Sequence, residues 1–160
     1  MAGKAKTPSK TDNSEDTLPD FKSLSETVFA SEQIELADIA AAKTSGVTTI
    51  VNNRPDGEDP SAPQSDAIKA EATAAGLNYV PIPIGHSGFS DAQIDAMIDA
   101  MKGAEGRLLA YCRSGTRSSF LWALASAKMG ADPDAITQAA LAAGYDVSPI
   151  RPMMDMLAAR

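Results

Sequence analysis

The chain has 160 residues, 44% of them hydrophobic and 22% charged, as is usual for one globular domain with a core of its own. The net charge of −7 argues against a nucleic-acid surface, and no apolar run reaches the roughly 20 residues that span a bilayer. A single cysteine and a single histidine exclude an intramolecular disulfide and a zinc cage of Cys and His. We therefore expect no metal, no cofactor, no nucleic acid and no membrane contact.

The first 20 residues mix Lys, Ser, Thr, Asp and Pro without hydrophobic periodicity. They are predicted to form a disordered tail, and residues 21–160 to form one catalytic domain. Because the tail has no hydrophobic leader segment, we expect a cytoplasmic protein.

Short apolar segments then alternate with alanine-rich amphipathic segments. In chain order we expect a strand at 27–31, a helix at 36–46, a strand at 47–53, a loop at 54–63, a helix at 65–76 and a strand at 77–84. After a loop at 85–89 we expect a helix at 90–103, a strand at 107–111, a loop at 112–117 and helices at 118–130, 132–144 and 148–160. Ser90 and Gln93 have capping-box spacing, and prolines place 77–84 near a sheet edge.

Strands that alternate with helices indicate a single α/β domain, with a mainly parallel central sheet flanked by helices. Ligands of such folds bind beyond the carboxyl ends of the strands, where the loops 53–63, 85–89 and 112–117 should meet. Phe120, Leu121, Trp122 and Leu124 are expected to form core rather than to bind a ligand. Met153, Met154 and Met156 are expected to form the packing face of a terminal helix, with a partner-docking surface as the alternative.

The loop Cys112-Arg-Ser-Gly-Thr-Arg117 gathers a thiol, two guanidinium groups and a glycine. A cysteine between a strand and a helix faces unpaired backbone N–H groups and the positive end of the helix dipole, which favour the thiolate. Gly115 allows a positive φ, so that backbone N–H groups turn inward as an anion nest. The pattern predicts a cysteine nucleophile in an anion-binding loop. The alternative is a cysteine that only fills the core.

The segment "YCRSGTRS" resembles the active loop of rhodanese-type sulfurtransferases, whereas the layout from residue 27 to the helix after this loop resembles a dual-specificity or tyrosine phosphatase. Together with "NNRPDGE", the sequence is similar over about residues 21–128 to the phosphatase-like domain of beta-lactamase hydrolase-like proteins, which are also described as sulfur transferases. The resemblance implies a tyrosine-phosphatase-like fold with a strand–Cys loop–helix active site. It also implies a persulfide dioxygenase as a partner.

The chain departs from the phosphatase pattern at several positions. Tyrosine phosphatases carry His before the nucleophile and Arg six residues after it, whereas this chain has Tyr111 before Cys112 and Arg117 five residues after it. Phosphatases also use an aspartic acid to protonate the leaving oxygen. Here His86 stands at the expected place, and Asp91 reads more simply as the first helical residue.

The short loop and the missing acid favour sulfane-sulfur transfer. A persulfide adds one sulfur about 2 Å from the thiol sulfur, and sulfite or a thiolate leaves without a proton. We therefore predict a sulfurtransferase that uses Cys112 and Arg117 on thiosulfate or a persulfide. A phosphatase that uses a phosphocysteine is the first alternative, and a non-catalytic anion-binding or docking module is the second.

The other candidate site residues have less specific roles. Ser118 is expected to bind the thiolate or cap the helix, Arg54 to bind an anion or clamp its loop, and Asp56 to border the pocket. His86, Asp91 and Asp56 are candidates for steering the substrate or acting as an acid. The residues expected to hold the anion are Arg113, Ser114, Gly115, Thr116, Ser118 and Arg54.

Overall fold

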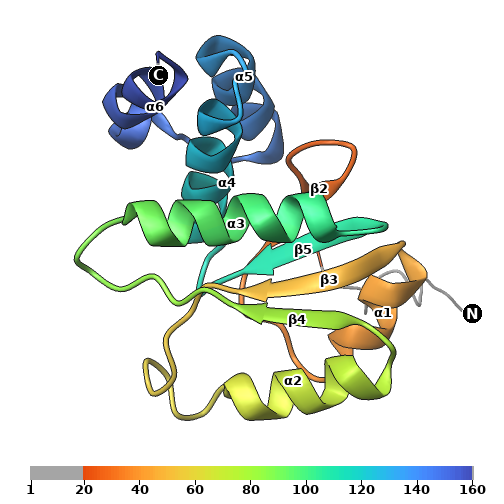
Figure 1. Cartoon of the computed structure of the whole chain (residues 1–160). Helices are drawn as coiled ribbons and strands as arrows, with labels where there is room; N and C mark the ends of the chain where they lie inside the picture. Colours follow the sequence, from red (N-terminus) through yellow and green to blue (C-terminus); the bar gives the residue numbers. More distant parts are fainter. Residues whose placement is uncertain (1–19, 160) are drawn as a thin grey trace, which may run out of the picture.

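The computed structural model describes residues 20–159, which form five strands and six α-helices (Figure 1). The strands are β1 (Lys22–Ser23), β2 (Val28–Ser31), β3 (Val47–Asn52), β4 (Asn78–Pro81) and β5 (Arg107–Tyr111). The helices are α1 (Asp38–Thr44), α2 (Ser65–Ala74), α3 (Asp91–Gly103), α4 (Thr116–Lys128), α5 (Pro133–Ala143), the 3-10 turn η2 (Ser148–Ile150) and α6 (Arg151–Ala158). The predicted tail lies outside these residues except for Asp20.

The sheet has the strand order β1-β2-β5-β3-β4. All neighbouring strands are parallel except β1, which pairs antiparallel with β2 at one edge. The strand β5 therefore lies at the centre, and its register aligns Tyr111 with Ser31 of β2 and Asn52 of β3. This confirms the predicted α/β fold, and it places the residue after Tyr111 at the middle of the carboxyl edge.

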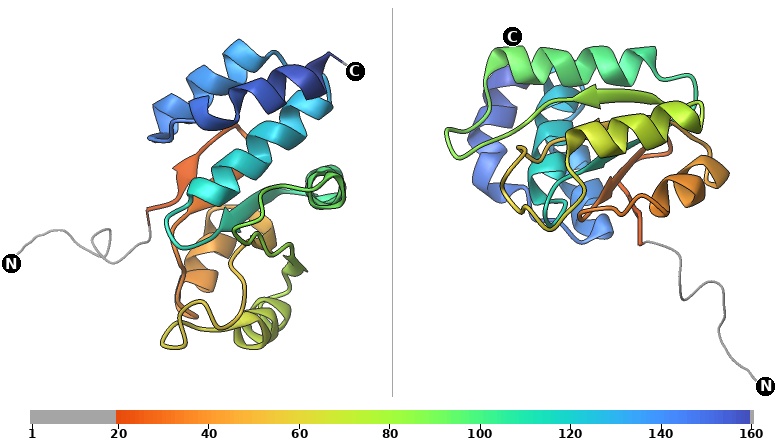
Figure 2. Two further views of the ribbon diagram at one scale, coloured as in Figure 1. Left: turned by 90° about the vertical axis from the view of Figure 1, so that its left-hand side faces the viewer. Right: turned by 90° about the horizontal axis from the view of Figure 1, so that it is seen from below.

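Helices cover both faces of the sheet, with α1 and α2 on one face and α3 to α6 on the other (Figure 2). Successive residues of β5 point to opposite faces. Leu108 and Ala110 pack with residues of α3 and α4, whereas Leu109 and Tyr111 pack with residues of α1 and α2. Both faces of the sheet are therefore buried, as in other parallel sheets.

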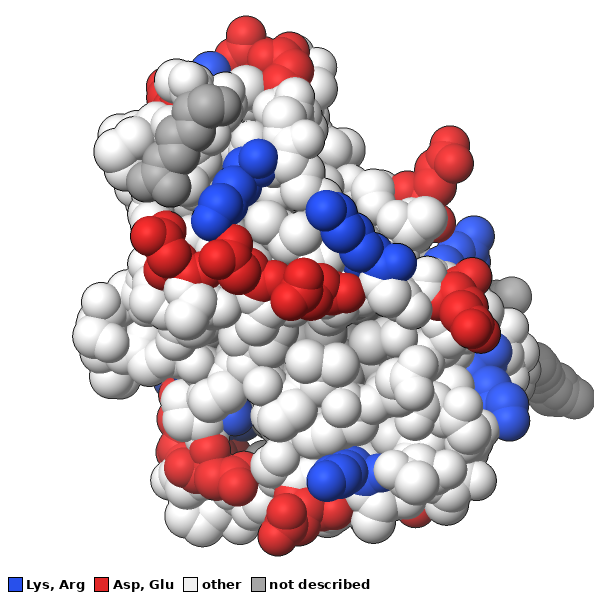
Figure 3. All heavy atoms as spheres, in the orientation of Figure 1, with Lys and Arg blue, Asp and Glu red and all other residues white. Residues whose placement is uncertain are grey.

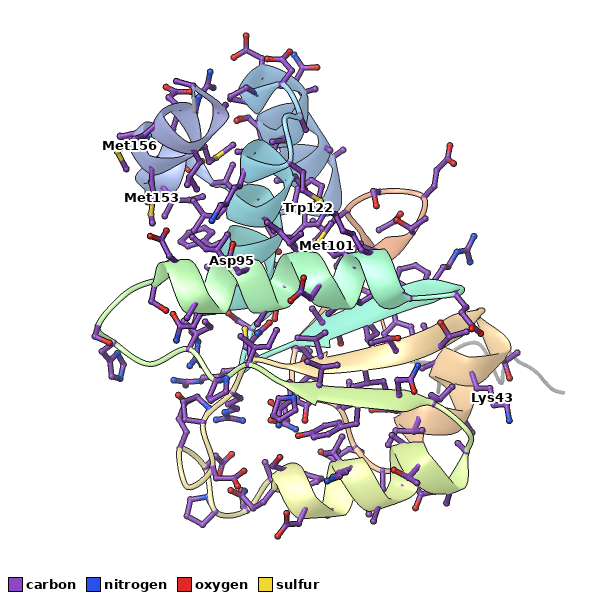
Figure 4. All side chains as sticks on the ribbon, viewed as in Figure 1. Lys43, Asp95, Met101, Trp122, Met153 and Met156 are labelled. Carbon is purple, nitrogen blue, oxygen red and sulfur yellow. The ribbon has the colours of Figure 1, made fainter. Side chains whose placement is uncertain are left out.

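The helix α4 is buried on nearly all sides because α3, α5 and α6 surround it. Leu121, Trp122 and Leu124 are buried as predicted, and Trp122 and Met101 of α3 point toward each other (Figure 4). Among the methionines of α6, Met154 is buried but Met156 is 55% exposed. These contacts pack the helix that follows the cysteine loop against the sheet and the other helices.

Several element boundaries differ from the prediction by one to three residues, as in β4, which ends at Pro81 rather than at residue 84. The helix α4 begins at Thr116, two residues earlier than expected, because the last residues of the loop already turn into the helix. The segment 148–160 was expected to be one helix with Pro149 at its first position. Instead Ser148–Ile150 form a 3-10 turn, and α6 begins at Arg151 with Pro152 in its first turn.

The surface carries a row of acidic side chains over α3 (Figure 3), whose exposed residues include Asp91, Asp95 and Asp99. One of them, Asp95, forms an ion pair with Lys128 of α4 at 2.6 Å. None of the helices in the described part of the chain is long and apolar enough to cross a membrane.

Candidate active site

Cys112 follows β5 directly and is fully buried at the carboxyl edge of the sheet. Its N–H donates to the carbonyl of Ser31, at the end of β2. On the other side, the N–H of Asn53 donates to the carbonyl of Tyr111 at 2.8 Å. The two neighbouring strands thus fix the backbone on both sides of the thiol.

The cysteine loop turns back toward the sulfur at Gly115, which has a φ of +92°. The N–H of Gly115 donates to the sulfur of Cys112 at 3.1 Å. Gly115 is also the N-cap of α4, so the thiol lies at the positive end of this helix. This is the predicted local geometry, although Thr116 directs its N–H to the Ser114 hydroxyl rather than to the sulfur.

The guanidinium of Arg117 lies beside the thiol and is held by Glu58. Both carboxylate oxygens of Glu58 accept from Arg117, at 2.8 and 2.9 Å, and the carbonyl of Ile84 accepts from it at 2.9 Å. Hydrogen bonding to Glu58 raises the pKa of Arg117 above its usual value, and the negative charge of Cys112 raises it further. Arg117 therefore stays charged next to the thiol.

Glu58 also binds Arg54, whose Nε donates to it at 2.7 Å. A second nitrogen of Arg54 donates to the side chain of Gln33, and the Arg54 side chain is only 9% exposed. Hydrogen bonds and the charges of Arg117 and Arg54 lower the pKa of Glu58 from 4.5 to about 2. Arg54 thus has the geometry of a loop clamp, which was one of its two predicted roles.

A groove of about 450 Å³ opens beside the cysteine loop. It brings together the three loops expected at this edge, and its walls include Glu58, His86, Arg113 and Arg117 as polar groups and Phe89 and Phe120 as an aromatic pair. Arg113 and His86 are exposed there, so both are free to meet an anionic ligand.

Two of the predicted carboxylates lie outside this groove. Asp91 is the first residue of α3 and is exposed, behind the capping box that Ser90 and Gln93 form as expected. Asp56 accepts from the N–H of Ser65 at the start of α2 and lines a separate hollow with Arg54 and three prolines. Sequence spacing alone did not distinguish the two hollows, because both border the loop after β3.

Ser118 does not have either of its expected contacts. It is fully buried inside α4, and its hydroxyl donates to the Asn53 side chain at 2.7 Å. Asn53 in turn donates to the carbonyl of Ile82. Ser118 therefore joins α4 to the ends of β3 and β4 instead of capping the helix or binding the sulfur.

Two residues beside the loop were not found from the sequence. Glu58 was part of the quoted motif "NNRPDGE", and its value as a partner for arginines could have been inferred from that loop. Tyr145 gave no signal, because it lies between α5 and η2, 33 positions from Cys112 in the sequence. Its hydroxyl lies 3.5 Å from the carbonyl oxygen of Ser114.

Within residues 20–159 no cluster of three or more His, Cys, Asp or Glu side chains is arranged to hold a metal ion. The described groups at the site are a thiol, the arginines, one ionised carboxylate, the imidazole of His86 and backbone N–H groups.

A central strand, a cysteine loop with an arginine and a buried helix define a protein of the tyrosine-phosphatase-like fold. The chain belongs to the family described as "Beta-lactamase hydrolase-like protein, phosphatase-like domain", whose model matches residues 20–129. The family resemblance inferred from the sequence is therefore confirmed.

Curated relatives and solved structures agree with this assignment. A beta-lactamase hydrolase-like protein of Agrobacterium fabrum is 36% identical over 107 residues, which are 67% of this chain and 25% of that protein. One from Xylella fastidiosa is 43% identical over 79 residues, which are 49% of this chain and 18% of that protein. The chain thus spans a quarter or less of the curated relatives it matches.

Among solved structures, a "putative phosphatase" of Neisseria meningitidis is similar with a TM-score of 0.75 and 32% identity, over 86% of this chain and 98% of that one. The structure of PTPMT1, at 14% identity and a TM-score of 0.64 over 88% of this chain and 97% of that one, shares the fold.

Proposed function

We propose that this domain transfers sulfane sulfur through a persulfide on Cys112. The observation that carries the proposal is the protonation state of an acidic side chain. Among the described residues that line the groove, only one is acidic. That residue is Glu58, which is ionised and bound to two arginines, with a pKa of about 2. Such a carboxylate has no proton to give to a leaving alkoxide at neutral pH.

Sulfur transfer needs no such acid. The Cys112 thiolate attacks the outer sulfur of thiosulfate, a new S–S bond forms, and the S–S bond of thiosulfate breaks as sulfite leaves with the electron pair. An acceptor thiolate then attacks the outer sulfur of the Cys112 persulfide. The acceptor leaves as a persulfide, and the Cys112 thiolate is restored.

Groups of the site can interact with both the cysteine sulfur and the anionic part of the sulfur donor. Arg117 and the N–H of Gly115 lie beside the sulfur and stabilise the negative charge that it carries before and after each step. Arg113 and His86 are exposed on the groove and meet the anionic end of the donor. On this proposal the donor is a small anion such as thiosulfate or an organic persulfide, and a persulfide dioxygenase is the expected partner.

Phosphoester hydrolysis is the second candidate, and the comparisons favour it. The family description contains the word phosphatase, and the Neisseria relative at 32% identity is described as a "putative phosphatase". In that reaction Cys112 attacks phosphorus, and Arg117 binds the equatorial oxygens. His86, which lines the groove, is then a candidate for the proton donor.

Intact-mass measurement separates these functions. The protein is treated with thiosulfate, or with an aryl phosphate, and each sample is measured before and after reductant, with Cys112→Ser as the control. A reducible gain of one sulfur supports sulfur transfer, whereas aryl phosphate turnover without a sulfur adduct supports the phosphatase. A chain that gives neither, with its thiol intact, is the anion-binding or docking module.

A further inference from the structure

Tyr145 lies against the outer side of the cysteine loop, although it belongs to the link between α5 and η2. Its hydroxyl donates to the carbonyl oxygen of Ser114 at 3.5 Å, which is long for this type of bond. The hydroxyl also lies close to the backbone of Gly115, because a methyl group added to the α-carbon of Gly115 would overlap it. The phenol therefore contacts the loop at the residue where the backbone has its positive φ.

The carbonyl that Tyr145 contacts and the N–H that binds the sulfur belong to one peptide group. Because a peptide group is planar and trans, its C=O and N–H point in opposite directions. With the oxygen of Ser114 directed at Tyr145, the N–H of Gly115 is directed at the sulfur of Cys112, at 3.1 Å. A hydrogen bond to the oxygen also polarises the N–H at the other end of the group.

We propose that Tyr145 is a positioning residue that strengthens the Cys112 nucleophile through the Ser114–Gly115 peptide group. Its hydroxyl fixes the plane of this peptide from outside the loop, so that the N–H stays on the sulfur. The inference rests on Cys112 as the nucleophile and is independent of whether sulfur or phosphorus is transferred.

The surroundings of Tyr145 keep its hydroxyl able to donate. Burial of the ring raises the pKa of Tyr145 above its usual value, and the negative charges of Cys112, Asp20 and Glu32 raise it further. On the other side of the sulfur, Arg117 of α4 is the positive group. Across the neutral range the phenol thus stays protonated and able to donate its hydrogen bond.

Tyr145 also lies beyond residue 129, where the match to the family model ends. The helices α5 and α6 pack on α4 and carry the link that holds Tyr145 in place (Figure 1). On this proposal the C-terminal helices cover α4 and also position Tyr145 against the cysteine loop.

The test compares alkylation of Cys112 by iodoacetamide between pH 5 and 10 in the wild type, Tyr145→Phe and Leu141→Ala. The phenylalanine variant loses one oxygen and keeps the ring. We expect its alkylation at pH 7 to fall by about two- to tenfold, the size of one hydrogen bond, and to meet the wild-type rate at high pH. Leu141 is 57% exposed on α5, so Leu141→Ala controls for a change in the same segment and should follow the wild type.

The proposal is overturned if the alkylation profile of Tyr145→Phe superimposes on that of the wild type. It is also overturned if the variant loses the same fraction of the rate at every pH, because such a loss would indicate a general change in the access of iodoacetamide to Cys112. Gly115→Ala gives a second measurement, because its methyl group would collide with the phenol. Adding Tyr145→Ala to Gly115→Ala should recover part of the lost alkylation rate. If no folded Gly115→Ala protein is obtained, the Tyr145→Phe profile decides alone.

Discussion

Glu58 binds the guanidinium of Arg117 through both carboxylate oxygens while it accepts from Arg54 with one of them. Glu58, in the loop after β3, thus connects Arg117 of the cysteine loop to Arg54, which lies in the same loop as Glu58. The Glu58 side chain is 24% exposed, so solvent screens these contacts only in part.

This pairing predicts a pH-dependent stability. The pKa of Glu58 is about 2 in the folded chain against an ordinary value of 4.5. The contribution of Glu58 is therefore fully present above pH 4.5 and is lost as the pH falls toward 2. Glu58→Gln should lower the free energy of unfolding by about 1 to 3 kcal/mol at pH 7 and by almost nothing near pH 2.

Urea unfolding at pH 7, 4 and 2 measures this difference. Asp95→Asn is the matched control, because it also removes one carboxylate from an ion pair, but Asp95 is 56% exposed. We expect it to change stability by at most about 0.5 kcal/mol. Equal losses for Glu58→Gln at all three pH values would contradict the assigned role.

Ser118→Ala should reduce stability without reducing turnover. The change leaves the buried side-chain oxygen of Asn53 without its 2.7 Å donor, at a cost of about 1 to 3 kcal/mol. The thiol keeps its contact with Gly115, so kcat/KM per folded molecule should stay within about twofold of wild type. Thermal unfolding and initial rates test the two parts. A loss of turnover at unchanged stability would contradict this prediction and would indicate that Ser118 contacts the reacting atoms.

The proposed lack of a general acid predicts a substrate pattern. Any phosphatase activity should favour aryl phosphates, whose phenolate leaves without a proton, over alkyl phosphates. Asp91→Asn should change turnover by much less than the roughly 10²-fold loss that follows removal of an acid, because Asp91 lies outside the groove. His86→Ala, which alters the groove wall, is the companion variant. A collapse of alkyl phosphate turnover in either variant identifies the acid and favours the phosphatase.

The length of the cysteine loop should select the chemistry. One small residue inserted between Gly115 and Arg117 restores the phosphatase spacing and moves the guanidinium away from the sulfur, toward equatorial phosphoryl oxygens. The insertion variant should lose persulfide formation from thiosulfate and gain binding of vanadate, provided that circular dichroism shows it to be folded. Arg117→Lys in the natural loop should weaken anion binding, because an ammonium cannot replace the guanidinium fork. A folded insertion variant that keeps its sulfur preference would show that loop length is not decisive.

Much of the architecture follows from local sequence signals. The alternation of β-branched segments with alanine-rich ones predicts the parallel sheet, and the capping box at Ser90 predicts the start of α3. The two-residue strand β1 was missed because so short a segment carries no periodicity. The turn before α6 was misjudged because Pro149 and Pro152 both fit the first turn of a helix.

By itself the sequence determined the backbone geometry of the cysteine loop, because a cysteine, a glycine and an arginine at fixed spacing between a strand and a helix leave few backbone geometries. Only the tertiary structure decided which side chains surround that loop. Glu58 reaches Arg117 across 59 positions and Tyr145 reaches Ser114 across 31, through the packing of β3 beside β5 and of α5 and α6 on α4. Contacts of this kind depend on how separate elements pack in three dimensions, and the spacing of residues along the chain does not specify that packing.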